Sequence, residues 1–414
     1  MSVKKVFLIA GILIIIFGIF IGIVFLKNKK PAPSSVQTNC FNKEIILWSP
    51  FDRGVFRKVR DSVQKKYCIK LKIVKKNMSD IEQELASSAA SGEGPAIVYI
   101  SGEYLLKHKD FFAPQPQKDN TQKLLFSAYP DSIKQALGKE FLAYPISYDA
   151  LVVFWNKELL QSKGFSAPPG TLQELKEAIP ALKKVDAQGN IELSPIALGT
   201  AENIFHNQEI FLAYWKMLNP TVRLNNSSDV GKSFIATLDA LTVFANPGLE
   251  TFSWHPNMPL SREAFLQEKT AMVIDMYSFK DVIEKRNARF SYGIASLPKN
   301  SESAKQANYF DGRFFGVLSS HEKEGWLVLQ TLDEQYDDFI KSIKQPPVKI
   351  EAGKNLSGDE EMLFRELIIS DAFASINKDM LRSELDSDFA NWIANRKDTE
   401  SLIRYKQVPK FIIR

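Results

Sequence analysis

The chain has 414 residues, enough for two moderate hydrophobic cores, and its 45% apolar and 24% charged residues are ordinary for a globular protein. Its formal charge is +5, but residues 1–40 hold five lysines and no acidic residue. Subtracting these five from the 53 basic residues leaves 48, against 48 acidic residues, so the folded part is neutral. A neutral folded part argues against the basic surface that is typical of proteins that bind nucleic acid.

The amino-terminal region contains an apolar run, Val6–Leu26, of 21 residues without a polar side chain. A helix of this length spans the roughly 30 Å hydrocarbon core of a membrane. We therefore predict a membrane anchor within residues 1–30, followed by an exposed tether over residues 31–40. A cleaved signal peptide is the alternative, but it typically has a shorter apolar region and a nearby Ala-x-Ala site. Lysines flank the run on both sides, so charge does not decide its orientation.

The region from residue 44 to residue 100 alternates strand and helix patterns. We expect strands at 44–48, 69–73 and 96–100, and helices at 55–66 and 81–90. Strand, helix and strand within about 30 residues is a βαβ unit, which implies parallel strands and an α/β lobe.

Two cysteines, Cys40 and Cys68, each precede one of two strands that we expect to be parallel. This arrangement places them near the same edge of the sheet, within reach of each other. We predict a disulfide between them on the extracytoplasmic side of a membrane; the alternative is two unpaired, buried thiols.

The segment 141–182 has the pattern of a crossing between two lobes. Residues 144–149 form an extended polar and aromatic segment that Pro145 keeps out of a helix. Leu151–Trp155 is an unbroken apolar run, typical of a strand covered on both faces. Thr171 and Glu174 form a capping box that opens an amphipathic helix.

The remaining chain is mainly helical, with short strands between the helices. We expect helices at 209–218, 229–245 and 261–269, strands at 271–275, 292–298 and 314–318, and one long helix from Trp326 to Ile343. Pro346 and Pro347 interrupt the chain, and the tail from Asp359 is helical and charged.

Signatures of catalysis are weak in this sequence. The four histidines are isolated, no nucleophile motif is present, and neither cysteine has a nearby histidine, so we expect no enzyme activity, metal or cofactor. Acids and an arginine instead follow predicted strands, at Asp52, Arg53 and Glu103, and Asp149 lies at the crossing. Ligands of open α/β sheets bind at such strand ends, and carboxylates with a guanidinium suit a polyhydroxylated ligand.

Several segments resemble extracellular solute-binding proteins of ABC importers, and the maltose/maltodextrin-binding branch of that family above all. They are EIILWSPFDRGVFRKV, SGEGPAIVYIS, AYPISYDALVVFWNKELL, AFLQEKTAMVIDMYSF and YGIASLPK, in the family's order over most of residues 44–345. The resemblance implies an α/β, two-lobed periplasmic-binding-protein-like fold (type II) with three hinge crossings, near 147–151, 310–316 and 345–349. We assign residues 41–148 and 312–345 to the first lobe, and 152–308 and 348–414 to the second.

The resemblance also implies a ligand site between the lobes. Asp52, Arg53, Glu103 and Asp149 match family positions that bind sugar hydroxyls. We expect aromatic contacts from Tyr148, Phe205, Tyr277 or Phe279.

The implied function is capture of a polar solute, a sugar or oligosaccharide, by hinge closure for ABC importer permease subunits. The protein would be a single-pass cell-membrane protein, spanning through residues 6–26 with residues 31–414 on the extracytoplasmic side. Two alternatives remain open: a ligand-sensing or scaffold ectodomain without a transport role, and a membrane-tethered glycosidase using a carboxylate pair such as Asp149 with Asp52 or Glu103.

Overall fold

The computed structural model describes residues 40–91, 94–116, 126–138, 140–222, 227–301, 306–371 and 378–394. The predicted anchor at 6–26 and almost all of the tether lie outside these residues. Within the described part, none of the helices has the length and apolar character needed to cross a membrane.

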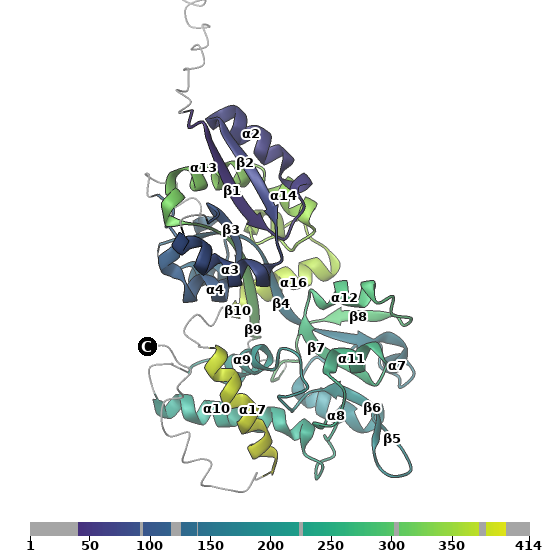
Figure 1. Ribbon diagram of the computed structural model, residues 1–414. Helices are drawn as coiled ribbons and strands as arrows, with labels where there is room; N and C mark the ends of the chain where they lie inside the picture. The colour runs from purple at the N-terminus through teal and green to yellow at the C-terminus, as the bar shows by residue number, and fades with distance from the viewer. Residues whose placement is uncertain are drawn as a thin grey trace, which may run out of the picture.

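The first lobe, which is the upper one in Figure 1, contains a sheet in which β2 (Ile69–Lys75), β1 (Lys43–Ser49) and β3 (Ile97–Ser101) are neighbouring parallel strands. Val59 and Val63 of α2 are buried because they lie four residues apart on one helix face. This arrangement confirms the predicted βαβ unit. The helices of this lobe are η1 (Arg53–Phe56), α2 (Arg57–Tyr67), α3 (Met78–Ser91), α4 (Gly102–Lys107), η2 (Lys109–Phe111), α6 (Asp131–Leu137), η4 (Ser319–His321), α13 (Glu322–Asp333) and α14 (Tyr336–Ile343).

Two long strands, β4 (Ala143–Asn156) and β9 (Asn308–Val317), connect the lobes. The first half of β4 pairs antiparallel with β9, and its second half pairs antiparallel with β7 and β8. All 14 residues of β4 are buried, as the apolar run had predicted for its second half. An isolated bridge between Ser147 and Pro347 brings the predicted third crossing to the same place.

The second lobe contains β7 (Thr270–Met276), β6 (Ile191–Ala197), β5 (Lys184–Val185) and β8 (Tyr292–Ala295), with β6 and β7 parallel. The predicted capping box begins α8, because Thr171 accepts the N–H of Glu174 and Glu174 accepts that of Thr171. The helices here are α7 (Lys157–Gln161), α8 (Leu172–Leu182), α9 (Asn207–Leu218), α10 (Ser227–Thr242), η3 (Val243–Ala245), α11 (Ser261–Leu266) and α12 (Phe279–Lys285).

The carboxyl-terminal elements are α15 (Ile350–Gly353), α16 (Gly358–Ile369), β10 (Ser370–Asp371) and α17 (Lys378–Ala394). The N–H of Ile350 donates to Ala128 of the first lobe, and α16 then packs on α6, β4, β8 and β9 beside the crossing. The last described helix, α17, packs on α9 and α10 of the second lobe (Figure 1). The last helices therefore bridge the two lobes.

One predicted element is corrected by the structure. The long helix expected from Trp326 to Ile343 is divided into α13 and α14, because Gln335 has a non-helical backbone conformation. The break allows the hydroxyl of Tyr336 to donate to the carbonyl of Ile146 and to accept the N–H of Val348. These two bonds tie α14 to β4 and to the third crossing.

Cys40 and Cys68 form a disulfide with a Cα–Cα distance of 5.0 Å. The strands that follow them, β1 and β2, are parallel and in register from Lys43 opposite Ile69. Because the two parallel strands start level in this register, the cysteines that precede them meet at one end of the sheet.

Candidate functional site

Polar side chains gather where β4 and β9 cross between the lobes. In the antiparallel register Asp149 lies opposite Asp311, and Ser147 lies opposite Arg313. Side chains alternate between the two faces of a strand, so these four residues share one face of the sheet. The crossing therefore holds two carboxylates and one guanidinium on a single face.

The carboxylate of Asp149 is only 9% exposed and is bound mainly by backbone groups. Its Oδ1 accepts the N–H of Ala150 at 3.0 Å and the N–H of Ser278 at 3.1 Å. Burial raises the pKa of Asp149 above its ordinary value of 3.8, and the bonds from Ser278 and the charge of Arg313 only partly oppose this rise. Asp149 is thus a buried acid whose negative charge is incompletely compensated.

Sequence reasoning did not identify Arg313 or Asp311 as site residues, although it placed a crossing over 310–316. Arg313 is ion-paired with Asp311 two residues earlier on β9, and their side chains are 18% and 22% exposed. Burial lowers the pKa of the Arg313 guanidinium, but Asp311 outweighs burial and the net pKa is raised. Asp311 and Arg313 lie two residues apart in β9, and this spacing in an extended strand is the sequence feature that places both charges on one face.

The first-lobe candidates lie at the carboxyl ends of neighbouring parallel strands. Asp52 and Arg53 follow β1, and Glu103 lies in the first turn of α4, directly after β3. All three side chains are exposed, and Asp52 forms an ion pair with Lys75 at 2.7 Å. The structure thus brings these residues to one edge of the first-lobe sheet, while Asp149 is buried at the crossing.

The four aromatic candidates have different environments. Tyr277 is 7% exposed, and its hydroxyl accepts a hydrogen bond from Lys280 at 3.0 Å. Tyr148 is 1% exposed and, as the neighbour of Asp149 on β4, lies on the opposite face of the strand. Phe279 is fully buried against Phe154, so the expectation of a ligand-stacking role is corrected to a core role for Phe279.

Phe205 is the exposed member of this aromatic set, with 38% of its surface accessible. It lies in the loop that follows β6, whose carboxyl end adjoins that of β7. The end of β7 in turn joins the crossing, since Tyr277 donates its N–H to Ala150. Phe205 and Asp149 are therefore on the same edge of the second-lobe sheet.

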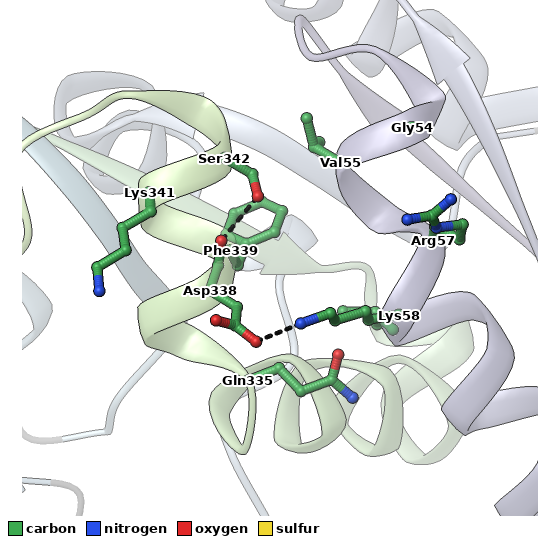
Figure 2. A pocket seen from close by; sticks show the side chains of 10 residues that line it. Gly54, Val55, Arg57, Lys58, Gln335, Asp338, Phe339, Lys341 and Ser342 are labelled. Atoms are coloured by element: carbon green, nitrogen blue, oxygen red, sulfur yellow. Dashed lines mark hydrogen bonds and ion pairs between the residues drawn. The ribbon is translucent and has the colours of Figure 1, made fainter.

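Two surface cavities lie elsewhere, on the first lobe. The first, of about 350 Å³, lies between the start of α2 and α14, and Figure 2 shows the ion pair of Lys58 with Asp338 across it. The second, of about 430 Å³, lies between α14 and the start of α15 and includes Lys349 and Glu351. Neither cavity contains a residue of the crossing site. No cluster of three potential metal ligands occurs in the part of the chain that the structure describes.

Comparison with known proteins assigns the chain to a family. Residues 58–329 match the family described as bacterial extracellular solute-binding protein. The chain belongs to this family. It is also 21% identical to the galactooligosaccharide-binding protein of Bacillus subtilis (strain 168) over 303 residues, which are 70% of this chain and 68% of the relative.

Solved structures share the fold of this solute-binding protein at low sequence identity. A cyclo/maltodextrin-binding protein complexed with maltotetraose superposes with a TM-score of 0.67 at 15% identity, over 88% of this chain and 95% of the other. A solute-binding protein from Thermotoga lettingae bound with α-D-tagatose has a TM-score of 0.63 at 16% identity, over 89% and 99%. The two-lobed α/β architecture of this chain is thus the fold of these two solved binding proteins.

Proposed function

We propose that this solute-binding protein captures a polar carbohydrate, a sugar or oligosaccharide, between its lobes and delivers it to the permease subunits of an ABC importer. The single observation that carries the proposal is the set of charged groups at the crossing, where Asp149, Asp311 and Arg313 share one face. The family match and the names of the similar proteins support the ligand class.

The ligand contacts follow from the chemistry of these groups. Carboxylates accept hydrogen bonds from sugar hydroxyls, and guanidinium groups donate to hydroxyl oxygens. Asp149, with Asp311 and Arg313, would bind one side of the ligand at the hinge. Asp52, Arg53 and Glu103 would approach from the first lobe, and Phe205 and Tyr277 from the second, where aromatic rings cover the apolar face of a sugar. Tyr148 and Phe279 would support these groups from within the core.

Capture would proceed by closure of the lobes around the crossing strands, with no covalent chemistry. Asp52, Arg53 and Glu103 of the first lobe are exposed, so water solvates their charges in this structure. Closure removes water from them, and the hydroxyls of the ligand replace the lost hydrogen bonds. A ligand without such hydroxyls would not replace the hydrogen bonds to water that closure removes, which favours carbohydrates.

Calorimetric titration with a panel of oligosaccharides tests the proposal. We expect wild-type protein to bind at least one of them. Asp149→Ala and Arg53→Ala should each weaken this binding roughly 10- to 150-fold, because each removes a hydrogen bond of a charged group. Asp338→Ala is the matched control, since Asp338 lies in the cavity of Figure 2 and outside the crossing.

Two results would contradict the proposal in different ways. A wild-type protein that binds none of the oligosaccharides would refute the ligand class. Binding that Asp149→Ala and Arg53→Ala both leave unchanged would show that the ligand occupies another site. Turnover of a chromogenic glycoside by the wild type would instead establish the glycosidase alternative.

We further propose that residues 6–26 anchor the protein in the cell membrane, with residues 31–414 on the extracytoplasmic side. The support is the 21-residue apolar run in an extracellular solute-binding protein. Amino-terminal sequencing of the protein from membranes should find residues upstream of Leu26. A mature terminus beyond Leu26 would rule out the anchor.

A further inference from the structure

The exposed ring of Phe205 is stacked on a charged side chain. The Cζ atom of Arg262 lies 4.0 Å from the ring centroid of Phe205. The same guanidinium also lies 5.1 Å from the centroid of Phe279, which is buried. Arg262 therefore contacts one exposed ring and one core ring, and a guanidinium is attracted to the π-face of each.

A buried acid fixes the orientation of this guanidinium. Nε of Arg262 donates to Oδ2 of Asp275 at 2.7 Å, and Nη2 donates to Oδ1 at 2.6 Å. Asp275 is fully buried on β7, and its Oδ1 also accepts the N–H of Met276 at 2.7 Å. Two parallel bonds hold the plane of an arginine fork, whereas a lysine ammonium makes a single point contact.

The stacked pair is connected to the crossing site by consecutive contacts. Ser278 donates its N–H to Asp149, and the next residue is Phe279, whose ring faces Arg262. Arg262 in turn lies against Phe205. Phe205 therefore stands at the same sheet edge as Asp149, with one ring face covered by the guanidinium.

We propose that Arg262 is a positioning residue that holds the ring of Phe205 as a fixed platform for the apolar face of a sugar. This inference rests on the proposed carbohydrate-binding function and adds a residue that acts on the ligand only through Phe205. A guanidinium that contacts two rings and donates to both oxygens of a carboxylate has little freedom to turn towards a ligand. A fixed Phe205 ring would favour pyranosides, which present a flat C–H surface, and would disfavour linear or fully polar polyols.

The test combines a double-mutant cycle with a direct observation of the ring. Calorimetry would measure oligosaccharide binding by wild type, Phe205→Ala, Arg262→Lys and the double variant, after circular dichroism has established that each is folded. We expect either single change to weaken binding roughly 3- to 10-fold, the scale of one aromatic contact. The double variant should bind no more weakly than Phe205→Ala, because both changes remove the same platform. Arg286→Lys, an exposed arginine paired with Glu263, is the matched control and should bind as wild type does.

A fluorine probe makes the positioning role measurable without ligand. With 4-fluorophenylalanine at position 205, the charge and contact of the Arg262 guanidinium should shift the fluorine resonance away from that of a free ring, and Arg262→Lys should move it back towards that value. An unchanged resonance, or single effects on affinity that add in the double variant, would overturn the inference. Failure of wild type to bind any oligosaccharide would overturn the proposed function alone, since the fluorine measurement still decides whether Arg262 orients the ring.

Discussion

Two buried acids of this protein, Asp149 at the crossing and Asp275 in the second lobe, lie in neighbouring parts of the structure but have different partners. Asp275 receives both bonds of the Arg262 fork, and its charge is matched within its own lobe. Asp149 is bound by two backbone N–H groups, while the nearby Arg313 is already paired with Asp311.

This difference separates a structural ion pair from a site prepared for a ligand. A buried carboxylate with a bidentate guanidinium is fully satisfied, so removing either partner leaves an unpaired charge. A buried carboxylate held by neutral donors keeps capacity for further hydrogen bonds, which a hydroxylated ligand supplies. The comparison predicts that substitutions at Asp275 mainly lower the stability of the fold, and that substitutions at Asp149 mainly weaken ligand binding.

The largest expected effect comes from removing the partner of Asp275. Arg262→Met should lower the free energy of unfolding by about 3–5 kcal/mol, because it leaves a fully buried carboxylate without its bidentate cation and with only His206 nearby. Adding Asp275→Asn to this variant should recover part of the loss. Urea unfolding measures both variants. If Arg262→Met stays within 1 kcal/mol of the wild type, about the contribution of one ordinary hydrogen bond, then Asp275 does not depend on its ion pair and the two acids are equivalent.

The second effect concerns the disulfide, which is remote from both acids. Replacing Cys40 and Cys68 by serine should lower the free energy of unfolding by about 3–4 kcal/mol, the entropy of closing a loop of this length. Oligosaccharide affinity should stay unchanged in conditions where the variant is folded. A large loss of affinity would mean that the edge of the sheet at β1 and β2 affects the crossing site directly. Thermal unfolding and calorimetry supply the two measurements.

The smallest expected effect is on the pH dependence of the free energy of unfolding, and it distinguishes Asp149 from Asp275 most directly. The pKa of Asp149 is raised in the folded protein, so the folded state favours its protonated form. Its contribution to stability is therefore present below the ordinary pKa of 3.8 and is lost as pH rises through the folded-state value. Relative to the wild type, Asp149→Asn should gain stability as pH rises above 3.8. Urea unfolding at a series of pH values would measure this; a constant difference would contradict the raised pKa.

His206, which lies beside Arg262, provides the control in a separate pH range. Burial alone would lower its pKa, but Glu209 and Asp275 outweigh burial and Arg262, and the pKa is raised above 6.5. Its stabilising contribution is therefore present below pH 6.5 and is lost as pH rises through the folded-state value. His206→Gln should remove the dependence near neutral pH and leave that of Asp149 unchanged.

Local patterns in the sequence predicted the elements that depend on neighbouring residues. The capping box of Thr171 and Glu174, the buried run at 151–155 and the βαβ unit all follow from spacing within a few residues. The position of Asp149 at the crossing was predicted for the same reason, since Pro145 and the apolar run define an extended segment around it. The break at Gln335 was missed, because helical periodicity continues on both sides of it.

By itself, the sequence determined the α/β class, the family resemblance, the apolar amino-terminal run and the residues at the ends of the strands. Only the tertiary structure decided which charges meet. The antiparallel register of β4 and β9 places Arg313 on the same face of the sheet as Asp149, although the two residues are far apart in the chain. Arg262 of α11 pairs with Asp275 of β7. Phe205 contacts Arg262 because its loop packs on α11. Pairing across elements depends on register and packing, which no local spacing specifies.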